Sequence, residues 1–128
     1  MCNGKKRILI FDDDSKSVKI LKDAFEKDGT VEFETATSRF ETGFLALRFR
    51  PHYILMDIKF NGKGKCAIFN LLQKAPELSG TKIIGLSESI SAGKKNALRK
   101  KGYVGFLEKP FKAEDIESQI RSLKSDSP

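Results

Sequence analysis

The chain has few of the residues that mark several common classes of protein. Its two cysteines, Cys2 and Cys66, fit no metal-binding spacing, so we expect two reduced thiols rather than a disulfide framework or a zinc site. No apolar run approaches the ~20 residues that span a bilayer, and no secretory signal pattern opens the chain. These absences argue against membrane-spanning and disulfide-rich secreted proteins and predict a cytoplasmic location.

What is present is typical of one globular domain. At 128 residues, with 39% hydrophobic and 32% charged residues, the chain can bury a core and is too apolar to be disordered. We find no internal repeat, linker or low-complexity segment, and therefore predict a single domain over residues 1–128 with a short tail at 125–128.

The net charge of +7 suits an acidic partner or nucleic acid as well as a solvated surface. The lysines are spread along the chain, and no basic run carries the aromatic residues that stack on bases. We therefore favour a solvated surface and expect no direct binding to nucleic acid.

Short apolar runs alternate with helical periodicity along the whole chain. The runs that predict strands are 7–11, 31–35, 53–57, 81–86 and 103–108, and the segments that predict helices are about 15–29, 38–49, 67–76, 89–102 and 113–123. Such alternation predicts a parallel sheet with right-handed crossovers and helices on both faces. The segment 53–57 is apolar up to its last residue, which indicates a buried strand, whereas 31–35 alternates with charges, which indicates an edge strand.

The second predicted helix carries two local signals. Ser38 and Glu41 match a capping box, in which the two side chains satisfy backbone amides of the first turn. Phe40, Phe44 and Leu47 recur at helical spacing, so we expect them to face the core.

Polar side chains follow four of the predicted strands. Asp12 and Asp13 come after the first strand, Asp57 ends the third, Ser87 follows the fourth and Lys109 follows the fifth. Because ligands bind beyond the carboxyl ends of parallel strands, we expect these side chains to surround one pocket. Crowded carboxylates repel unless a cation neutralises them, and Mg²⁺ takes hard oxygen ligands of this kind.

Together these groups suit phosphoryl transfer to a carboxylate. Asp57 is the candidate nucleophile, with Mg²⁺ and Lys109 neutralising charge on the transferring oxygens and Ser87 bonding one of them. Asp14, the third consecutive aspartate, or Ser15 is explained as the cap of the first helix.

These motifs resemble the receiver domain of two-component response regulators. The likeness runs from Lys6 to about Leu123 and rests on the acidic pair, the aspartate after the third strand, the serine after the fourth and Lys-Pro-Phe at 109–111. The resemblance implies a flavodoxin-like, doubly wound (βα)5 fold with strand order 2-1-3-4-5. It also implies a phosphoprotein that catalyses only its own phosphorylation and dephosphorylation, and is otherwise not an enzyme.

The resemblance further implies the ligands and partners. Mg²⁺ is expected on Asp13 and Asp57, on Asp12 through water, and on the backbone carbonyl of Lys59. The phosphoryl group is expected from a sensor histidine kinase or a histidine phosphotransfer protein. A downstream effector protein, or an output domain missing from this chain, is expected to receive the signal of this phosphorelay.

A conformational switch is implied as well. On phosphorylation of the aspartate, Ser87 is expected to move toward the phosphoryl group, and Phe106 to turn into the space that this movement leaves. The face formed by the fourth helix, fifth strand and fifth helix then changes shape.

The chain departs from the family pattern at three places near Asp57. Asn61 replaces a usual proline, Gly64-Lys65 replaces the usual Asp-Gly, and Glu88 stands where a small residue is common, so that an anion beside the site can restrict access. The alternatives are a pseudo-receiver that binds partners without phosphate, a hydrolase with an aspartate nucleophile, and a flavin-binding protein. Lys59 stands where such a hydrolase needs its second carboxylate, and the acidic loop after the first strand disfavours a flavin phosphate.

Overall fold

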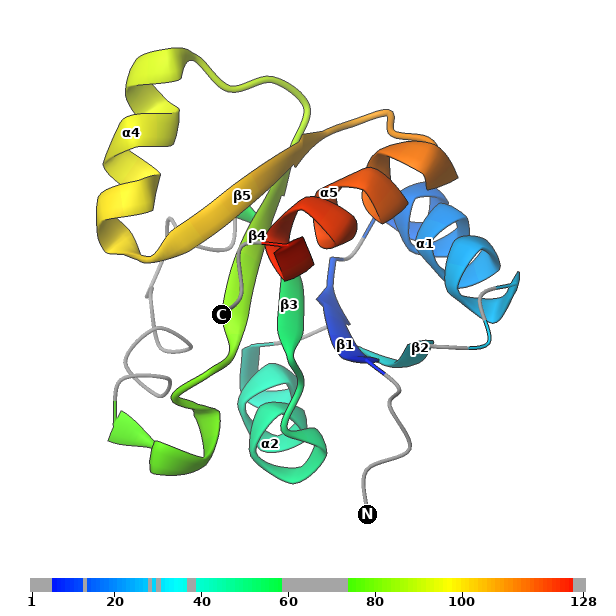
Figure 1. Cartoon of the computed structure of the whole chain (residues 1–128), viewed down its shortest axis with the longest axis vertical. Coiled ribbons are helices and arrows are strands. Elements are labelled where there is room, and N and C mark those ends of the chain that lie inside the picture. The colour runs from blue at the N-terminus through cyan, green and yellow to red at the C-terminus, as the bar shows by residue number, and fades with distance from the viewer. Residues whose placement is uncertain are drawn as a thin grey trace.

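The described part of the chain forms one five-stranded parallel sheet flanked by helices in this computed structural model (Figure 1). The structure describes residues 6–12, 14–27, 29, 31–36, 39–58 and 74–125. The strands are β1 (Lys6–Phe11), β2 (Val31–Ala36), β3 (Tyr53–Asp57), β4 (Lys82–Ser87) and β5 (Tyr103–Glu108). The helices are α1 (Ser15–Lys27), α2 (Arg39–Phe49), the 3₁₀ helix η2 (Pro76–Leu78), α4 (Ala92–Lys101) and α5 (Ala113–Ser125). The order β2-β1-β3-β4-β5, with every neighbouring pair parallel, confirms the predicted fold class.

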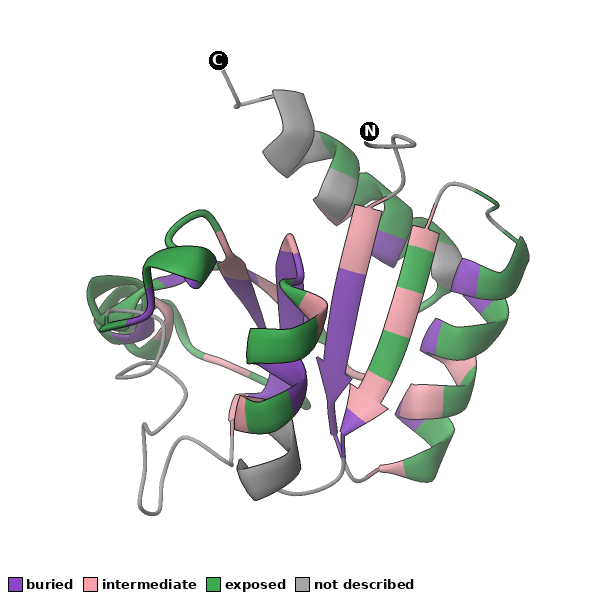
Figure 2. Ribbon diagram, turned by 90° about the horizontal axis from the view of Figure 1, so that it is seen from below, coloured by how far each residue is buried: buried purple, intermediate pink, exposed green. Residues whose placement is uncertain are grey.

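The burial of each strand follows its sequence pattern. All five residues of β3 are buried, as are residues 8–11 of β1, because strands between two helix layers bury both faces. Strand β2 lies at the edge and alternates between partly buried residues and the exposed Glu32 and Glu34 (Figure 2). Both the buried central strand and the edge strand were predicted from the sequence.

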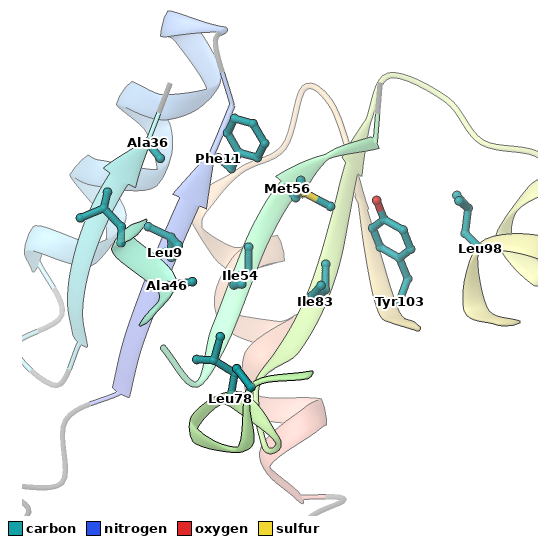
Figure 3. Close-up of a cluster of buried hydrophobic side chains, with 12 residues drawn as sticks. Leu9, Phe11, Ala36, Ala46, Ile54, Met56, Leu78, Ile83, Leu98 and Tyr103 are labelled. Carbon is teal, nitrogen blue, oxygen red and sulfur yellow. The ribbon is translucent and has the colours of Figure 1, made fainter. Parts of the chain in front are cut away.

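Helices cover the two faces of the sheet. Leu21 of α1 and Ile116 of α5 pack on one face, in a cluster that includes Ile84. Ala46 of α2 and Leu98 of α4 belong to the cluster on the other face, which Figure 3 shows around β3 and β4. Each fully buried aliphatic side chain contributes about 1.5–3 kcal/mol relative to an exposed one, so these two clusters hold the strand ends in place.

Side chains that accept hydrogen bonds mark the starts of α1 and α4, and a glycine marks the end of α4. Asp14, one of two predicted caps, accepts a hydrogen bond from the N–H of Lys16 at 3.1 Å and begins α1. Ser91, one of two predicted caps, accepts from the N–H of Lys94 at 3.2 Å and begins α4. Gly102 ends α4 with φ 128°, a conformation that side chains rarely adopt.

The predicted inward face of α2 is wrong. Phe44 and Leu47 are 58% and 43% exposed, whereas Leu45 and Ala46 are 7% and 0% exposed. Apolar residues occupy every side of this helix, so its periodicity does not select a face, and packing against β1 and β2 decides it. The side chain of Phe40 lies outside the described residues.

Some predictions fall on residues that the structure does not describe. These are Ser38 of the capping box, Cys2 and Cys66, and most of the third predicted helix at 67–76. Helix α5 extends to Ser125, two residues past its predicted end and one residue into the predicted tail. Among the described residues, no helix is long and apolar enough to cross a bilayer.

Candidate functional site

The carboxyl ends of four strands meet at one edge of the sheet. Asp12 follows β1, Asp57 ends β3, Ser87 ends β4 and Lys109 follows β5. The backbone N–H of Lys109 donates to the carbonyl of Ser87 at 2.7 Å, which aligns the ends of β4 and β5. The peptide bond between Lys109 and Pro110 is cis. The sheet therefore brings together the four described residues that the sequence predicted to share a pocket.

Lys109 joins the two described carboxylates of this group. Its Nζ lies 2.8 Å from Oδ2 of Asp12 and donates a hydrogen bond of 2.9 Å to Oδ2 of Asp57. The side chains are 8%, 0% and 5% exposed for Lys109, Asp12 and Asp57, so solvent screens this cluster very little. An ammonium held between two buried carboxylates is placed to follow negative charge that is added to either one.

Burial and ion pairing change the pKa values of Asp12 and Lys109. The pKa of Asp12 is raised above its ordinary value, because burial penalises the carboxylate more than Lys109 and the N–H of Asp14 stabilise it. Burial also acts to lower the pKa of Lys109, but the hydrogen bonds to Asp12 and Asp57 outweigh it, and that pKa is raised. Lys109 is therefore charged at neutral pH, and its contact with Asp12 offsets part of the effect of burial on that carboxyl.

Asp14 is a site residue that its sequence pattern did not reveal. Its Oδ2 lies 3.7 Å from Nζ of Lys109 and accepts a hydrogen bond of 2.8 Å from the hydroxyl of Ser17. That hydroxyl is the main cause that lowers the pKa of Asp14. Its position in a run of three aspartates was the available signal, but the helix-capping role explained it fully.

Two of the four predicted magnesium ligands lie within the described residues. Asp12 and Asp57 offer the one or two carboxylates that Mg²⁺ commonly takes, and both are buried at the same end of the sheet, where a cation offsets their mutual repulsion. The residues present therefore fit the ion. Asp13 and Lys59 lie outside the described residues, and the described ones contain no group of three His, Cys, Asp or Glu arranged to bind a metal.

The predicted switch residues occupy neighbouring strands. Phe106 is partly buried and pairs with Gly85 of β4, where an added Cβ would lie 3.1 Å from its ring. Its ring stacks on Tyr103 at a centroid distance of 5.7 Å, and the guanidinium of Arg99 lies 5.4 Å from its centroid. Gly85 thus leaves space that Ile58 and the two aromatic rings fill, which no sequence spacing indicated.

Ser87 begins the loop between β4 and α4. Its hydroxyl donates to the carbonyl of Ser89 at 3.3 Å, a long bond at the surface. Glu88, the residue between them, is exposed. The hydroxyl of Ser87 is therefore held only weakly by the loop, and its rotation requires little energy.

Fold and site together define a doubly wound α/β protein with an acidic site and a lysine at the carboxyl edge of its sheet. The sequence profile of the response regulator receiver domain matches residues 8–121. The chain belongs to this family. No curated protein matches the chain significantly.

Solved structures agree with this fold. A response regulator from Desulfuromonas acetoxidans is 22% identical with a TM-score of 0.82, over 94% of this chain and 97% of that one. The chemotaxis protein CheY4 of Vibrio cholerae is 21% identical with a TM-score of 0.77, over 92% and 98%. A CheY-like receiver domain protein from Methanospirillum hungatei is 27% identical with a TM-score of 0.75, over 95% of each chain.

Proposed function

We infer that the chain is the phosphoacceptor module of a two-component phosphorelay and that Asp57 accepts the phosphoryl group. The observation that carries this proposal is the position of Lys109, whose ammonium contacts both Asp12 and Asp57 at the edge where four strands end. An ion pair used only for stability is no better than apolar packing at a buried position. A buried cation beside a candidate nucleophile therefore favours chemistry with anions.

The proposed reaction is a single displacement at phosphorus. An oxygen of Asp57 forms the new bond to phosphorus, and the bond from phosphorus to the imidazole nitrogen of a phosphohistidine breaks, with the electron pair leaving on that nitrogen. A carboxylate nucleophile needs no general base, and Lys109 donates a 2.9 Å hydrogen bond to this one. The Lys109 ammonium then pairs with the phosphoryl oxygens, and the hydroxyl of Ser87 rotates to donate a hydrogen bond to one of them.

Magnesium completes this site in the proposal. Asp12 and Asp57 would hold it, together with Asp13 and the backbone carbonyl of Lys59 as the sequence resemblance implies. When bound, the ion neutralises charge on the transferring phosphoryl oxygens. The chain's own residues orient the acceptor, because Asp12 and Asp57 are both buried and fixed to strand ends.

The signal leaves the site through Ser87 and Phe106. Rotation of Ser87 opens space beside β5, and Phe106, which rests over Gly85, shifts its population toward that space. The surface of α4, β5 and α5 changes with it and alters binding to an effector protein or an output domain. We propose a sensor histidine kinase or a histidine phosphotransfer protein as phosphodonor, in the cytoplasm, and no enzymatic activity beyond the chain's own phosphorylation and dephosphorylation.

Intact mass spectrometry after incubation with acetyl phosphate and Mg²⁺ tests the proposal. One added phosphoryl group is expected on the wild type and none on Asp57→Asn, which keeps the size of the side chain but removes its nucleophilic charge. Asp23→Asn, in an exposed pair with Lys19, is the matched control and should be labelled like the wild type. Absence of an adduct on the wild type, also with a phosphohistidine donor, would favour the pseudo-receiver alternative.

A further inference from the structure

Asp14 is the third carboxylate within ion-pair distance of Lys109. Its Oδ2 lies 3.7 Å from the ammonium nitrogen, compared with 2.8 Å for Asp12 and 2.9 Å for Asp57. The Asp14 side chain is 39% exposed, whereas that of Lys109 is 8% exposed. The ammonium therefore lies close to two buried carboxylates and farther from a third that is partly exposed.

The first turn of α1 fixes the position of the Asp14 carboxylate. Its Oδ1 accepts the N–H of Lys16 at 3.1 Å, and its Oδ2 accepts the hydroxyl of Ser17 at 2.8 Å. Ser17 is itself buried, at 5% exposure. The carboxylate cannot swing into solvent without breaking both bonds, so its negative charge stays near the Lys109 ammonium.

We propose that Asp14 is a positioning residue that draws the Lys109 ammonium toward α1 and thereby limits phosphorylation of Asp57. This inference rests on the proposed function. Helix capping alone explains the bonds to Lys16 and Ser17, but it does not require Oδ2 to lie 3.7 Å from a buried ammonium.

Asp14 slows phosphorylation of Asp57 through two electrostatic effects. Its charge repels an incoming phosphodonor that carries two negative charges, and it competes with the new phosphoryl group for Lys109. Both effects disappear when the carboxylate becomes an amide. Because Asp14 is partly exposed, both are also screened by salt, unlike contacts made inside the buried cluster.

The test compares Asp14→Asn with Asp14→Ala and the wild type. Asparagine keeps one acceptor oxygen at the start of α1 but removes the charge, whereas alanine removes both acceptors and the charge. With acetyl phosphate, a dianion at neutral pH, and Mg²⁺, the second-order rate constant of phosphorylation should rise about threefold in Asp14→Asn at low salt. Asp14→Ala should show a similar gain with a lower thermal midpoint, because it also loses the cap.

Donor charge separates electrostatics from a structural effect. Phosphoramidate carries one net negative charge at neutral pH. The increase in phosphorylation rate caused by Asp14→Asn should therefore be smaller with phosphoramidate than with acetyl phosphate, and 0.5 M salt should reduce the increase for both donors. As a readout without phosphoryl transfer, the dissociation constant of beryllofluoride, an anion that mimics a phosphoryl group, should fall by a similar factor. Ser17→Ala keeps the Asp14 charge but removes the hydrogen bond from the Ser17 hydroxyl to it. The increase in phosphorylation rate should be smaller in Ser17→Ala than in Asp14→Asn.

The outcomes distinguish this inference from the proposed function. A wild type that takes neither the phosphoryl group nor beryllofluoride overturns both. Normal labelling of the wild type, with an Asp14→Asn rate unchanged at low salt, overturns only the role of Asp14. A gain that is equal for both donors and insensitive to salt also overturns it, because it would show a structural origin.

Discussion

Replacing Lys109 with methionine tests how strongly the site depends on its central cation. Methionine keeps the approximate length of the side chain but leaves Asp12 and Asp57 without the ammonium that now lies 2.8 Å and 2.9 Å from them. Both carboxylates are nearly inaccessible to water, so solvent cannot replace the lost contacts. The folded state should therefore become less stable at neutral pH.

The expected loss follows from the burial of the cluster. Removing one partner of a buried ion pair typically lowers stability by about 3–5 kcal/mol. The Lys109 side chain is 8% exposed, so little of that effect is screened, and we expect a loss of about 3 kcal/mol in the free energy of unfolding. In a domain of this size the thermal midpoint should fall by about 10 °C.

Urea unfolding followed by far-ultraviolet circular dichroism measures this change without Mg²⁺, and suits a chain that has no tryptophan. The exposed Lys112, three residues along the chain, provides the control, and Lys112→Met should change stability by less than about 0.5 kcal/mol. In the double variant Lys109→Met with Asp57→Asn, about 1–2 kcal/mol should return, because the repulsion between Asp57 and Asp12 is removed.

Two results would refute this reasoning. The first is a Lys109→Met variant as stable as Lys112→Met, which would show that the buried cluster does not depend on the ammonium. The second is a double variant no more stable than Lys109→Met, which would show that the loss came from packing of the lysine stem rather than from charge.

Two further predictions concern other parts of the fold. Gly85→Ala should lower the free energy of unfolding by about 1–3 kcal/mol, because its Cβ would lie 2.7 Å from a side-chain atom of Ile58. The control is Gly93→Ala in α4, whose Cβ meets nothing within 4 Å and which should raise the free energy of unfolding. Equal effects of the two substitutions in urea unfolding would contradict the packing argument. Burial, together with the positive charges of Arg7 and Lys6, lowers the pKa of His52. The unfolded chain therefore binds a proton at His52 more readily than the folded chain does. The free energy of unfolding should fall as the pH drops below about 6.5 and through the folded-state pKa. In His52→Asn, which keeps an acceptor for the 2.9 Å bond from the Arg7 N–H, that part of the pH dependence should be absent; an unchanged pH profile would exclude His52 as its source.

The main features of the site could be predicted because the chemistry stands at strand ends. A buried strand that ends in Asp57 needs no tertiary information to be recognised, since a charge directly after apolar residues must lie at an edge of the sheet. Lys109 could be placed by the same argument once β5 was recognised. In a parallel sheet all carboxyl ends meet at one edge, so local strand assignments were enough to bring the two residues together.

Helix faces were less predictable than strands. The exposed Phe44 and the buried Ala46 belong to a helix with apolar residues all around it, and the strands beneath it selected the buried side. Asp14 illustrates a different limit, because one side chain serves as a helix cap and also lies 3.7 Å from Lys109. Sequence spacing shows the first role, and only the tertiary structure, which brings Lys109 after β5 to the start of α1, shows the second.

The sequence by itself determined the alternation of strands and helices, the buried central strand and the charged residues at the strand ends. These depend on neighbours along the chain, where residue type and period act directly. The tertiary structure decided the distances from the Lys109 ammonium to three carboxylates and the space over Gly85 that Phe106 and Tyr103 fill. Those contacts join residues tens of positions apart, and their energies depend on burial, which exists only after the helices have packed on the sheet.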